Sequence, residues 1–201
     1  MKTIVLASSN RGKLIEIQQV LTGLGLTLVS QGELGVDDAI EDGHTFIENA
    51  LIKARHACAV TGLPALADDS GLIVDALNGA PGLISAHYAG VHGDAGGNIR
   101  KVLAELASVP KARRTARFHS TIVLLRHAND PQPLIAEGSW EGRILEAPGG
   151  DGGFGYDPIF FDPALGACAA ELPPETKNRV SHRGQALAKL RERLREGRIL
   201  P

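Results

Sequence analysis

Aromatic side chains and net charge are both scarce in this chain of 201 residues. Aromatic residues make up 4% of it, which argues against a platform that stacks the bases of single-stranded nucleic acid. The net charge of -2 provides no basic field that would attract nucleic acid as a whole. We therefore expect no nucleic-acid partner, and an RNA-binding module is disfavoured.

Long apolar stretches and cysteine motifs are missing too. No window of about eighteen residues is apolar throughout, so no membrane span is expected. The apolar run in "MKTIVLASSN" (1–10) is too short for a signal peptide. Cys58 and Cys168 lie far apart without a CxxC spacing, so neither a disulfide framework nor a zinc site is expected. These features fit the reducing cytoplasm.

The chain does contain enough apolar residues, 43%, for a sizeable core. "KTIVLA" (2–7) and "LTLVS" (26–30) are typical of buried strands, and leucine, isoleucine and valine recur at helical spacing between residues 14 and 24. This strand–helix–strand order indicates an α/β fold. We expect one domain over residues 1–201, in which a central excursion of strands forms a second lobe and leaves a cleft between the lobes.

Capping and turn signals place the remaining elements. "TFIE" (45–48) is a capping box that begins a helix, and Gly62 to Pro64 end it. The elements expected after it are strands at 65–69 and 71–77, a helix near 98–107, a strand at 116–125, two short strands around a turn within 133–146, a Gly-rich loop at 147–157, and two helices after Pro174.

The segment "SSNRGK" (8–13) joins a buried strand to the N-terminus of a helix. Free backbone N–H groups and the helix dipole at such a junction attract anions. The candidate phosphate ligands are Ser8, Ser9, Asn10, Arg11, Gly12 and Lys13. A Walker motif is absent. From this segment alone, a plain capped turn is a slightly better interpretation than a phosphate-binding loop.

Two adjacent aspartates, Asp68 and Asp69, stand in "ADDSGL" (67–72), where a buried strand is expected to end. Like charges among apolar neighbours are unfavourable unless cations offset them. A divalent cation would do so, and all-oxygen ligands favour Mg²⁺ over zinc. Glu41, in a polar loop before a helix, is a candidate third carboxylate. The alternative is a surface turn in which both aspartates are solvated.

Two later segments contain candidate ligands for a nucleoside. "GGDGGFGYDP" (149–158) offers the flat rings of Phe154 and Tyr156 among glycines that permit close approach of a base. "KNRVSHRGQAL" (177–187) places Lys177, His182 and Arg183 around a helix start, where a bound anion or base edge would offset their unfavourable position. A mobile lid and an ordinary basic surface are the respective alternatives. Taken together, these segments predict a nucleoside triphosphate site with hydrolytic potential.

Five motifs in this order resemble those of the ITP/XTP pyrophosphatases, which remove non-standard purine nucleoside triphosphates. They are "SSNRGKLIE", "TFIENALIKA", "ADDSGLIVDAL", "GGFGYDPIF" and "SHRGQAL". The resemblance runs from residue 3 to about residue 190. It implies a two-lobed α/β fold with a long mixed central sheet flanked by helices, and a homodimer. It also implies that ITP, dITP or XTP reacts with water, with Mg²⁺ as cofactor, to give the monophosphate and pyrophosphate.

The resemblance further implies roles for individual residues. Asp69 would bind Mg²⁺ and accept a proton, with Asp68 and Glu41 supporting the metal. Which carboxylate is the base and which is the ligand stays open. The phosphates would lie on residues 8–13, with Lys53 nearby, although a helix lysine of this kind also has a purely structural interpretation. The residues implied to contact the rest of the substrate are Ser70, Phe154, Gly155, Tyr156, Asp157, Lys177, His182 and Arg183.

Two positions depart from the pattern of the family. His87 stands where arginine is usual, which puts any charge-assisted contact of that arginine in doubt. Ser120 stands where cysteine is common, and we expect this change to be harmless. Two other functions stay open: a pyrophosphatase for other modified nucleotides, and a metal-dependent nucleotide sensor without turnover.

Overall fold

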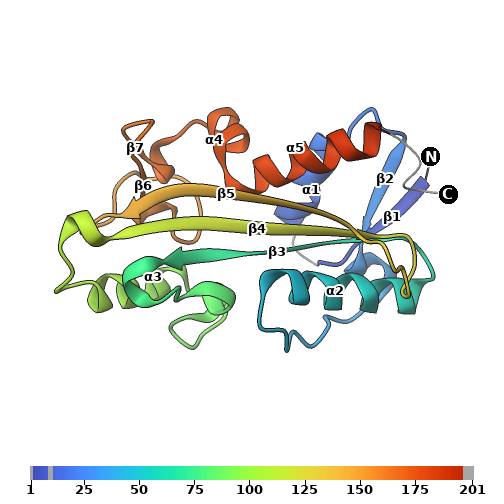
Figure 1. Cartoon of the computed structure of the whole chain (residues 1–201), viewed down its shortest axis with the longest axis horizontal. Helices are drawn as coiled ribbons and strands as arrows, with labels where there is room; N and C mark the ends of the chain where they lie inside the picture. Colours follow the sequence, from blue (N-terminus) through green and yellow to red (C-terminus); the bar gives the residue numbers. More distant parts are fainter. Residues whose placement is uncertain (1, 9–10, 197–201) are drawn as a thin grey trace. The chain divides into compact units, whose positions relative to one another are not determined.

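The computed structural model describes residues 2–8 and 11–196, with the backbone alone at 11 and 12 (Figure 1). It contains a seven-stranded mixed sheet in the order β2-β1-β3-β4-β5-β6-β7, flanked by helices. The strands are β1 (Lys2–Leu6), β2 (Leu26–Ser30), β3 (Ala65–Val74), β4 (Thr115–Leu125), β5 (Leu134–Ile144), β6 (Phe160–Asp162) and β7 (Ala167–Cys168). The α-helices are α1 (Arg11–Val20), α2 (Phe46–Thr61), α3 (Ala95–Glu105), α4 (Pro174–Val180) and α5 (His182–Arg195).

Short 3-10 helices join several of these elements. They are η1 (Gln31–Leu34), η2 (Asp75–Leu77), η3 (Gly82–His87), η4 (Lys111–Arg113), η5 (Asp157–Ile159) and η6 (Ala169–Glu171). The predicted α/β class and the long mixed sheet are confirmed. Among the described residues, no helix is both long and apolar enough to cross a membrane.

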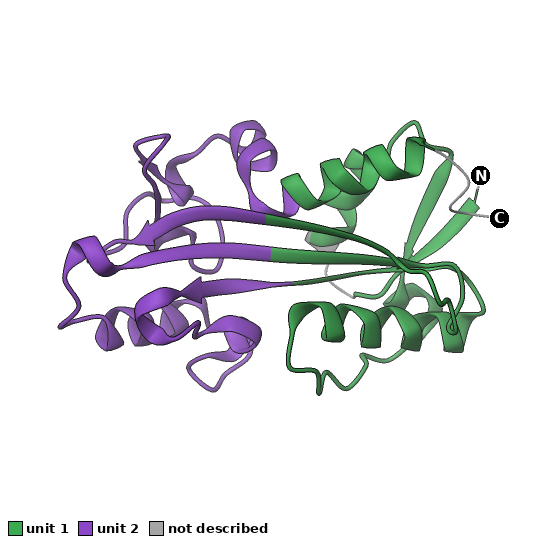
Figure 2. Ribbon diagram, in the orientation of Figure 1, with its two compact units in different colours: residues 1–69, 120–138, 185–201 green, residues 70–119, 139–184 purple. Residues whose placement is uncertain are grey.

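The chain divides into two compact units, which Figure 2 colours separately. Unit 1 consists of residues 1–69, 120–138 and 185–201, and unit 2 of residues 70–119 and 139–184. Strands β3, β4 and β5 each continue from one unit into the other. The expected cleft between two lobes stays a prediction.

In unit 1, alternate strand residues supply two separate cores, one for each face of the sheet. Ile4, Leu6 and Leu66 pack with apolar residues of α1 and α5. Val5 and Ala67, one position further along their strands, pack with alanines of α2 instead. This alternation follows from the two-residue period of a strand. It determines which helices the buried side chains of β1 and of the first residues of β3 meet.

In unit 2, a cluster of large rings fills the core. The Phe118 ring lies 4.6 Å from that of Phe160, and the Trp140 ring lies 5.0 Å from Phe160, measured between centroids. The indole N–H of Trp140 donates to Asp162 Oδ2 at 2.7 Å, which satisfies its one polar atom in a buried position. The few aromatic residues of this chain are thus concentrated in structural positions of unit 2.

Helix α2 begins and ends where the sequence predicts. Thr45 is the N-cap, and its Oγ1 accepts the N–H of Glu48 at 3.2 Å. The Glu48 carboxylate accepts the N–H of His44 at 2.8 Å, one residue before the cap. Gly62 ends the helix with a φ of 69°, a left-handed conformation that glycine adopts readily. The capping signal therefore fixes the helix that presents Lys53.

Two predicted breaks in the sheet are wrong. Residues 65–74 form one strand, β3, and residues 75–77 form η2, so the chain does not turn at Asp68 and Asp69. Residues 134–144 form the single strand β5. Gly142, within this strand, serves close packing: a Cβ there would lie 2.5 Å from the Phe160 ring and 2.6 Å from the Phe161 carbonyl oxygen. Short strands β6 and β7 were not expected.

Asp130 organises the connection between β4 and β5 in unit 1. Its carboxylate accepts the Nε–H of Arg126 at 2.8 Å and the backbone N–H groups of Arg126 and Gln132, both at 3.0 Å. A second guanidinium nitrogen of Arg126 pairs with its other oxygen. The bonds from Arg126 hold the pKa of Asp130 well below its usual value, despite burial. The charged form of Asp130 is therefore favoured by folding.

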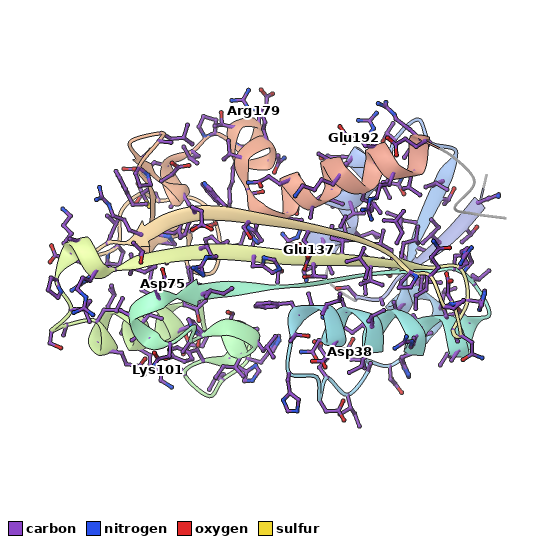
Figure 3. The ribbon with its side chains drawn as sticks, in the orientation of Figure 1. Asp38, Asp75, Lys101, Glu137, Arg179 and Glu192 are labelled. Carbon is purple, nitrogen blue, oxygen red and sulfur yellow. The ribbon has the colours of Figure 1, made fainter. Side chains whose placement is uncertain are left out.

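Asp130→Asn should lower the thermal midpoint at about pH 7 by about 3–6 °C, because asparagine keeps the shape but loses the charge. The folded pKa lies below the unfolded value of about 3.9, so this stabilisation is present at neutral pH and is lost on acidification. The difference in thermal midpoint between variant and wild type should therefore be smaller at about pH 3 than at about pH 7. Glu192→Gln, on the exposed side of α5 (Figure 3), is the control, and its thermal midpoint should differ little from that of wild type at either pH. An equal difference at both pH values would contradict the ion pair.

Candidate active site

Asp68 and Asp69 lie within strand β3 and point to opposite faces of the sheet. Asp68 shares its face with Leu66, which packs toward α1 and α5, and Asp69 shares its face with Ala67, which packs toward α2. Each carboxylate has its own lysine, from a different helix. Their mutual repulsion is thus reduced by geometry and by two cations, and the strand has no need to end there.

Asp68 is buried, with 3% of its surface exposed. Its Oδ1 accepts the hydroxyl of Ser120, on β4, at 2.7 Å. Its Oδ2 pairs with Nζ of Lys13, in the first turn of α1, at 2.8 Å. Ser120, which the sequence marked only as a harmless change, is therefore a direct partner of the buried carboxylate. A serine inside an apolar strand gave no signal of this contact, which exists only after β3 and β4 pair.

Asp69 lies opposite Lys53 of α2. Nζ of Lys53 is 2.7 Å from Asp69 Oδ1 and 3.0 Å from Oε2 of Glu41, in the loop before α2. One ammonium group thus bridges two of the predicted carboxylates. Both Lys53 and Asp69 are largely buried, whereas Glu41 is more exposed. Helix α2 packs against the face of β3 that carries Ala65 and Ala67, and Figure 1 shows this helix running beside β3.

The acid–base properties of this pair follow from its surroundings. Burial raises the pKa of Asp69 above its usual value; Lys53 opposes the rise, and the charges of Glu41 and Asp68 add to it. Burial alone would lower the pKa of Lys53, but Asp69 and Glu41 outweigh it, so the pKa of this amine is raised. The site therefore holds a permanent cation beside a carboxylate of increased basicity, a combination suited to taking a proton from water near an anion.

The predicted metal ligands are not gathered into one three-carboxylate set. Within residues 2–8 and 11–196, no group of three or more His, Cys, Asp or Glu side chains is arranged to hold a metal ion. Glu41 and Asp69 meet at Lys53, whereas Asp68 faces the other side of β3 with Lys13. The reason is the continuous strand, which sends neighbouring side chains to opposite faces.

The predicted phosphate loop is described only in part. Ser8 follows β1, and its N–H donates to the Leu6 carbonyl at 2.8 Å. Ser9 and Asn10 lie outside the described residues. Helix α1 begins at Arg11, so Gly12 and Lys13 belong to its first turn. The N-terminus of a helix thus lies within this segment, and Lys13 is near it.

In unit 2, the Gly-rich segment presents Phe154 at the surface. This side chain is 64% exposed, and Nζ of Lys177 lies 4.5 Å from the centre of its ring. Asp157 is buried and pairs with Lys177, and its Oδ2 also accepts the N–H of Phe154 at 2.6 Å. Gly155, between them, has a φ of 59°. The expectation of an accessible ring in this segment is correct for Phe154.

Tyr156 differs from that expectation. Its ring is buried in the core of unit 2, and its hydroxyl donates to the Ser85 carbonyl at 2.8 Å. The sequence pattern could not separate the two rings, because both stand between small or polar residues. In the structure, the Phe154 ring lies at the surface and the Tyr156 ring lies in the core.

His182 and Arg183 begin helix α5, and both are buried. The His182 ring stacks on Phe118 at 5.0 Å between centroids, with 15° between the planes. A guanidinium nitrogen of Arg183 donates to Oγ of Ser70 at 3.2 Å. The alternative of an ordinary basic surface is therefore wrong for these two residues. Ser70, next in sequence to Asp69, belongs with them in unit 2.

Gly184 explains how α4 and α5 meet so closely. A Cβ at this position would lie 1.7 Å from the carbonyl oxygen of Asn178, so only glycine fits. The N–H of Gly184 donates to Oγ of Ser181 at 3.1 Å, so Ser181 caps the N-terminus of α5. The "SHRG" motif is thus a tight helix junction that fixes His182 and Arg183.

This fold and these side chains define a class: an α/β protein that holds paired lysines and carboxylates on both faces of one strand. The chain belongs to the Ham1 family, whose sequence model matches residues 4–193.

This chain is also similar to individual proteins and to solved structures of the family. The chain is 64% identical over 194 residues to a protein of Xanthomonas oryzae pv. oryzae named dITP/XTP pyrophosphatase, covering 96% of this chain and 98% of that one. A protein of Vibrio cholerae with the same name is 54% identical over 198 residues, covering 98% and 99%. The structure of a HAM1 protein from Coxiella burnetii superimposes with a TM-score of 0.94 at 52% identity, covering 98% of this chain and all of the other. The Staphylococcus aureus Ham1 protein gives a TM-score of 0.89 at 36% identity, covering 97% and 99%.

Proposed function

We propose that this chain hydrolyses the non-standard purine nucleoside triphosphates dITP, ITP and XTP to the monophosphate and pyrophosphate. The observation that carries the proposal is the Lys53 ammonium between Asp69 and Glu41, at 2.7 and 3.0 Å. It places a cation for a phosphate beside a carboxylate of raised pKa. The relatives at 54–64% identity, which are named dITP/XTP pyrophosphatases, support the choice of substrate.

The proposed chemistry uses Asp69 as the proton acceptor. Asp69 takes a proton from a water molecule as its oxygen attacks the α-phosphorus of the substrate. The bond from the α-phosphorus to the bridging oxygen breaks, and pyrophosphate leaves with the bonding electrons. Lys53 and Lys13 stabilise the negative charge on the phosphate groups in the transition state. Pairing with carboxylates in the absence of substrate keeps both ammonium groups in place for this role.

We propose Mg²⁺ as the cofactor, held by Asp69 and Glu41 together with the substrate. The donors are all carboxylate oxygens, which suits this ion. Mg²⁺ commonly takes one or two carboxylates plus substrate phosphates and water, so a complete protein cage is not required. Bound there, Mg²⁺ would neutralise phosphate charge and increase the acidity of a coordinated water. Asp68, on the other face of β3, would act through Lys13.

We propose that the purine is recognised by residues of unit 2. Phe154 offers an exposed ring for stacking. Lys177, which pairs with Asp157, offers a hydrogen-bond donor, and so does Arg183, which is bonded to Ser70. The pairing of the His182 ring with Phe118 fixes the orientation of the imidazole. Preformed donors of this kind favour a base with an oxygen at position 6.

Product analysis tests the proposal directly. With dITP and Mg²⁺, the purified chain should release pyrophosphate and dIMP, without orthophosphate. Excess EDTA should lower the rate by about 100-fold or more, and added Mg²⁺ should restore it. Stepwise release of orthophosphate would contradict attack at the α-phosphorus. Tight binding without turnover would indicate a sensor, and preferred turnover of modified pyrimidines would indicate a different nucleotide pyrophosphatase.

We also propose a homodimer working in the cytoplasm. The homodimer is supported by the family resemblance, and sedimentation at several protein concentrations would test it. The cytoplasm is supported by Cys58 and Cys168, which are both buried and free. Fractionation of cells that contain the tagged chain would test the location.

A further inference from the structure

The Gly-rich segment of unit 2 is closed into a loop by bonds at its two ends. The N–H of Gly149 donates to the Pro158 carbonyl at 2.8 Å. The thiol of Cys168, on β7, reaches both ends, because its Sγ lies 3.0 Å from the Asp157 carbonyl oxygen, 3.3 Å from that of Pro158 and 3.4 Å from that of Gly149. Burial raises the pKa of Cys168, so the thiol keeps the proton that it donates.

Two glycines of this loop, Gly150 and Gly152, lie directly against η6, which follows Cys168. A Cβ on Gly152 would be 2.8 Å from the Ala170 carbonyl oxygen, and a Cβ on Gly150 would be 3.0 Å from the Ala170 carbonyl carbon. Contacts this short leave no room for a side chain. The glycines at 150 and 152 therefore serve close packing against η6, which argues against a mobile lid.

The closed loop carries the groups that the proposed function assigns to the base. The N–H of Phe154 donates to the buried Asp157 carboxylate, which also pairs with Lys177. Lys177 in turn lies over the Phe154 ring. The backbone of Asp157 is the same backbone that Cys168 contacts. A displacement of the loop from β7 and η6 would thus move Phe154, Asp157 and Lys177 together.

We propose that Cys168 and Ala170 are positioning residues for purine binding: they hold the loop 149–158 in its binding conformation before substrate arrives. Neither residue touches the base in this proposal, which rests on the proposed function for the role of Phe154. Because the loop is ordered before substrate binds, the entropic cost of ordering it does not reduce the free energy of binding. The expected consequence is that damage to this packing raises KM much more than it lowers kcat.

Two alanine substitutions in the same loop provide a matched test. Gly152→Ala places a Cβ against the Ala170 backbone, whereas Gly149→Ala meets only ordinary contacts, the nearest being Leu145 Cδ1 at 3.8 Å. Neither glycine has a positive φ that would make alanine unfavourable by itself. Gly152→Ala should raise KM for dITP by about tenfold or more, with kcat within about twofold, and Gly149→Ala should match wild type. Equal KM values for Gly152→Ala and wild type would overturn the proposal.

Substitution of the thiol separates its hydrogen bond from its volume. Cys168→Ala should raise KM for dITP by about threefold or more, and Cys168→Ser, which retains a donor, should recover part of that loss. Hydrogen exchange of the backbone amides at 149–157, measured without substrate, should be faster in Cys168→Ala and in Gly152→Ala than in wild type. Exchange rates that are unchanged in both variants would overturn the proposal, whatever the activity.

The exchange measurement also keeps this proposal distinct from the proposed function. If wild type releases no pyrophosphate from dITP, the proposed function fails, while faster exchange in both variants would still show that Cys168 and Ala170 hold the loop. If wild type is active and both variants match it in KM and exchange, the positioning role fails and the proposed function stands.

Discussion

Asp69→Asn should lower kcat for dITP by about 10³-fold or more and leave the thermal midpoint within a few degrees of wild type. Asparagine has the shape of aspartate, but it cannot accept the proton of the attacking water, and it is a poorer ligand for Mg²⁺. Lys53 keeps Glu41 as a partner at 3.0 Å, so the ammonium group is not left unpaired. Steady-state kinetics and melting curves on the same preparation measure both parts.

The stability part of this prediction follows from the raised pKa of Asp69. Burial and the neighbouring carboxylates make its charged form less favourable in the folded protein than in the unfolded chain. Removing that charge therefore takes away an unfavourable contribution to the free energy of folding, which offsets the lost contact with Lys53. A residue with this balance is retained for chemistry rather than for stability.

Asp68→Asn is the matched control, because it makes the same change one residue earlier on the opposite face of β3. Asp68 is more deeply buried and is bonded to both Ser120 and Lys13. Its substitution should lower the thermal midpoint by several degrees and reduce kcat less than Asp69→Asn does. Near-normal turnover in purified Asp69→Asn would show that Asp69 is only structural.

Local patterns in the sequence were enough to predict much of the fold. The boundaries of α2 follow from a cap at Thr45 and a glycine at 62, both of which act within one turn of the chain. Strands β1, β2 and β4 follow from short apolar runs. The motifs also predicted the lysines and carboxylates that meet at Lys53, although their distances required the packing of α2 on β3.

The wrong predictions share a physical cause. The sequence predicts a strand end at Asp68 and Asp69 and a turn within residues 133–146, but both strands continue, because the two charges and Gly142 have partners distant in sequence. Those partners are Lys13 and Lys53 for the two charges and the Phe160 ring for the glycine. Cys168 gave no signal at all, because its thiol acquires a role only when β7 lies beside the loop 149–158. Tertiary contacts of this kind leave no periodic trace in a single sequence.

In the proposed site, selection of the base depends on donors that are fixed before the base arrives, so it should give the second large effect. ITP and XTP present an oxygen at position 6, whereas ATP presents an amino group, which cannot accept a hydrogen bond from Arg183. Arg183 is buried and bonded to Ser70, so its N–H donors would face the amino group of ATP, which is itself a donor. Such a mismatch supports a preference for ITP over ATP of about 10⁴-fold. GTP shares the 6-oxygen, so a preference against GTP would have to come from its 2-amino group, by shape or by an unsatisfied donor.

Arg183→Ala should therefore reduce the ratio of kcat/KM for ITP to that for ATP by about 100-fold, mainly by loss of ITP turnover. Phe154→Ala is the control within the same set of residues, because the Phe154 ring is 64% exposed and would stack on any base. It should lower kcat/KM for ITP, XTP and ATP by similar factors and leave their ratios unchanged. Measurement of all three nucleotides with each variant separates affinity from selection. An ITP-over-ATP ratio in Arg183→Ala equal to that of wild type would assign the readout of position 6 to another donor, such as Lys177 or His182.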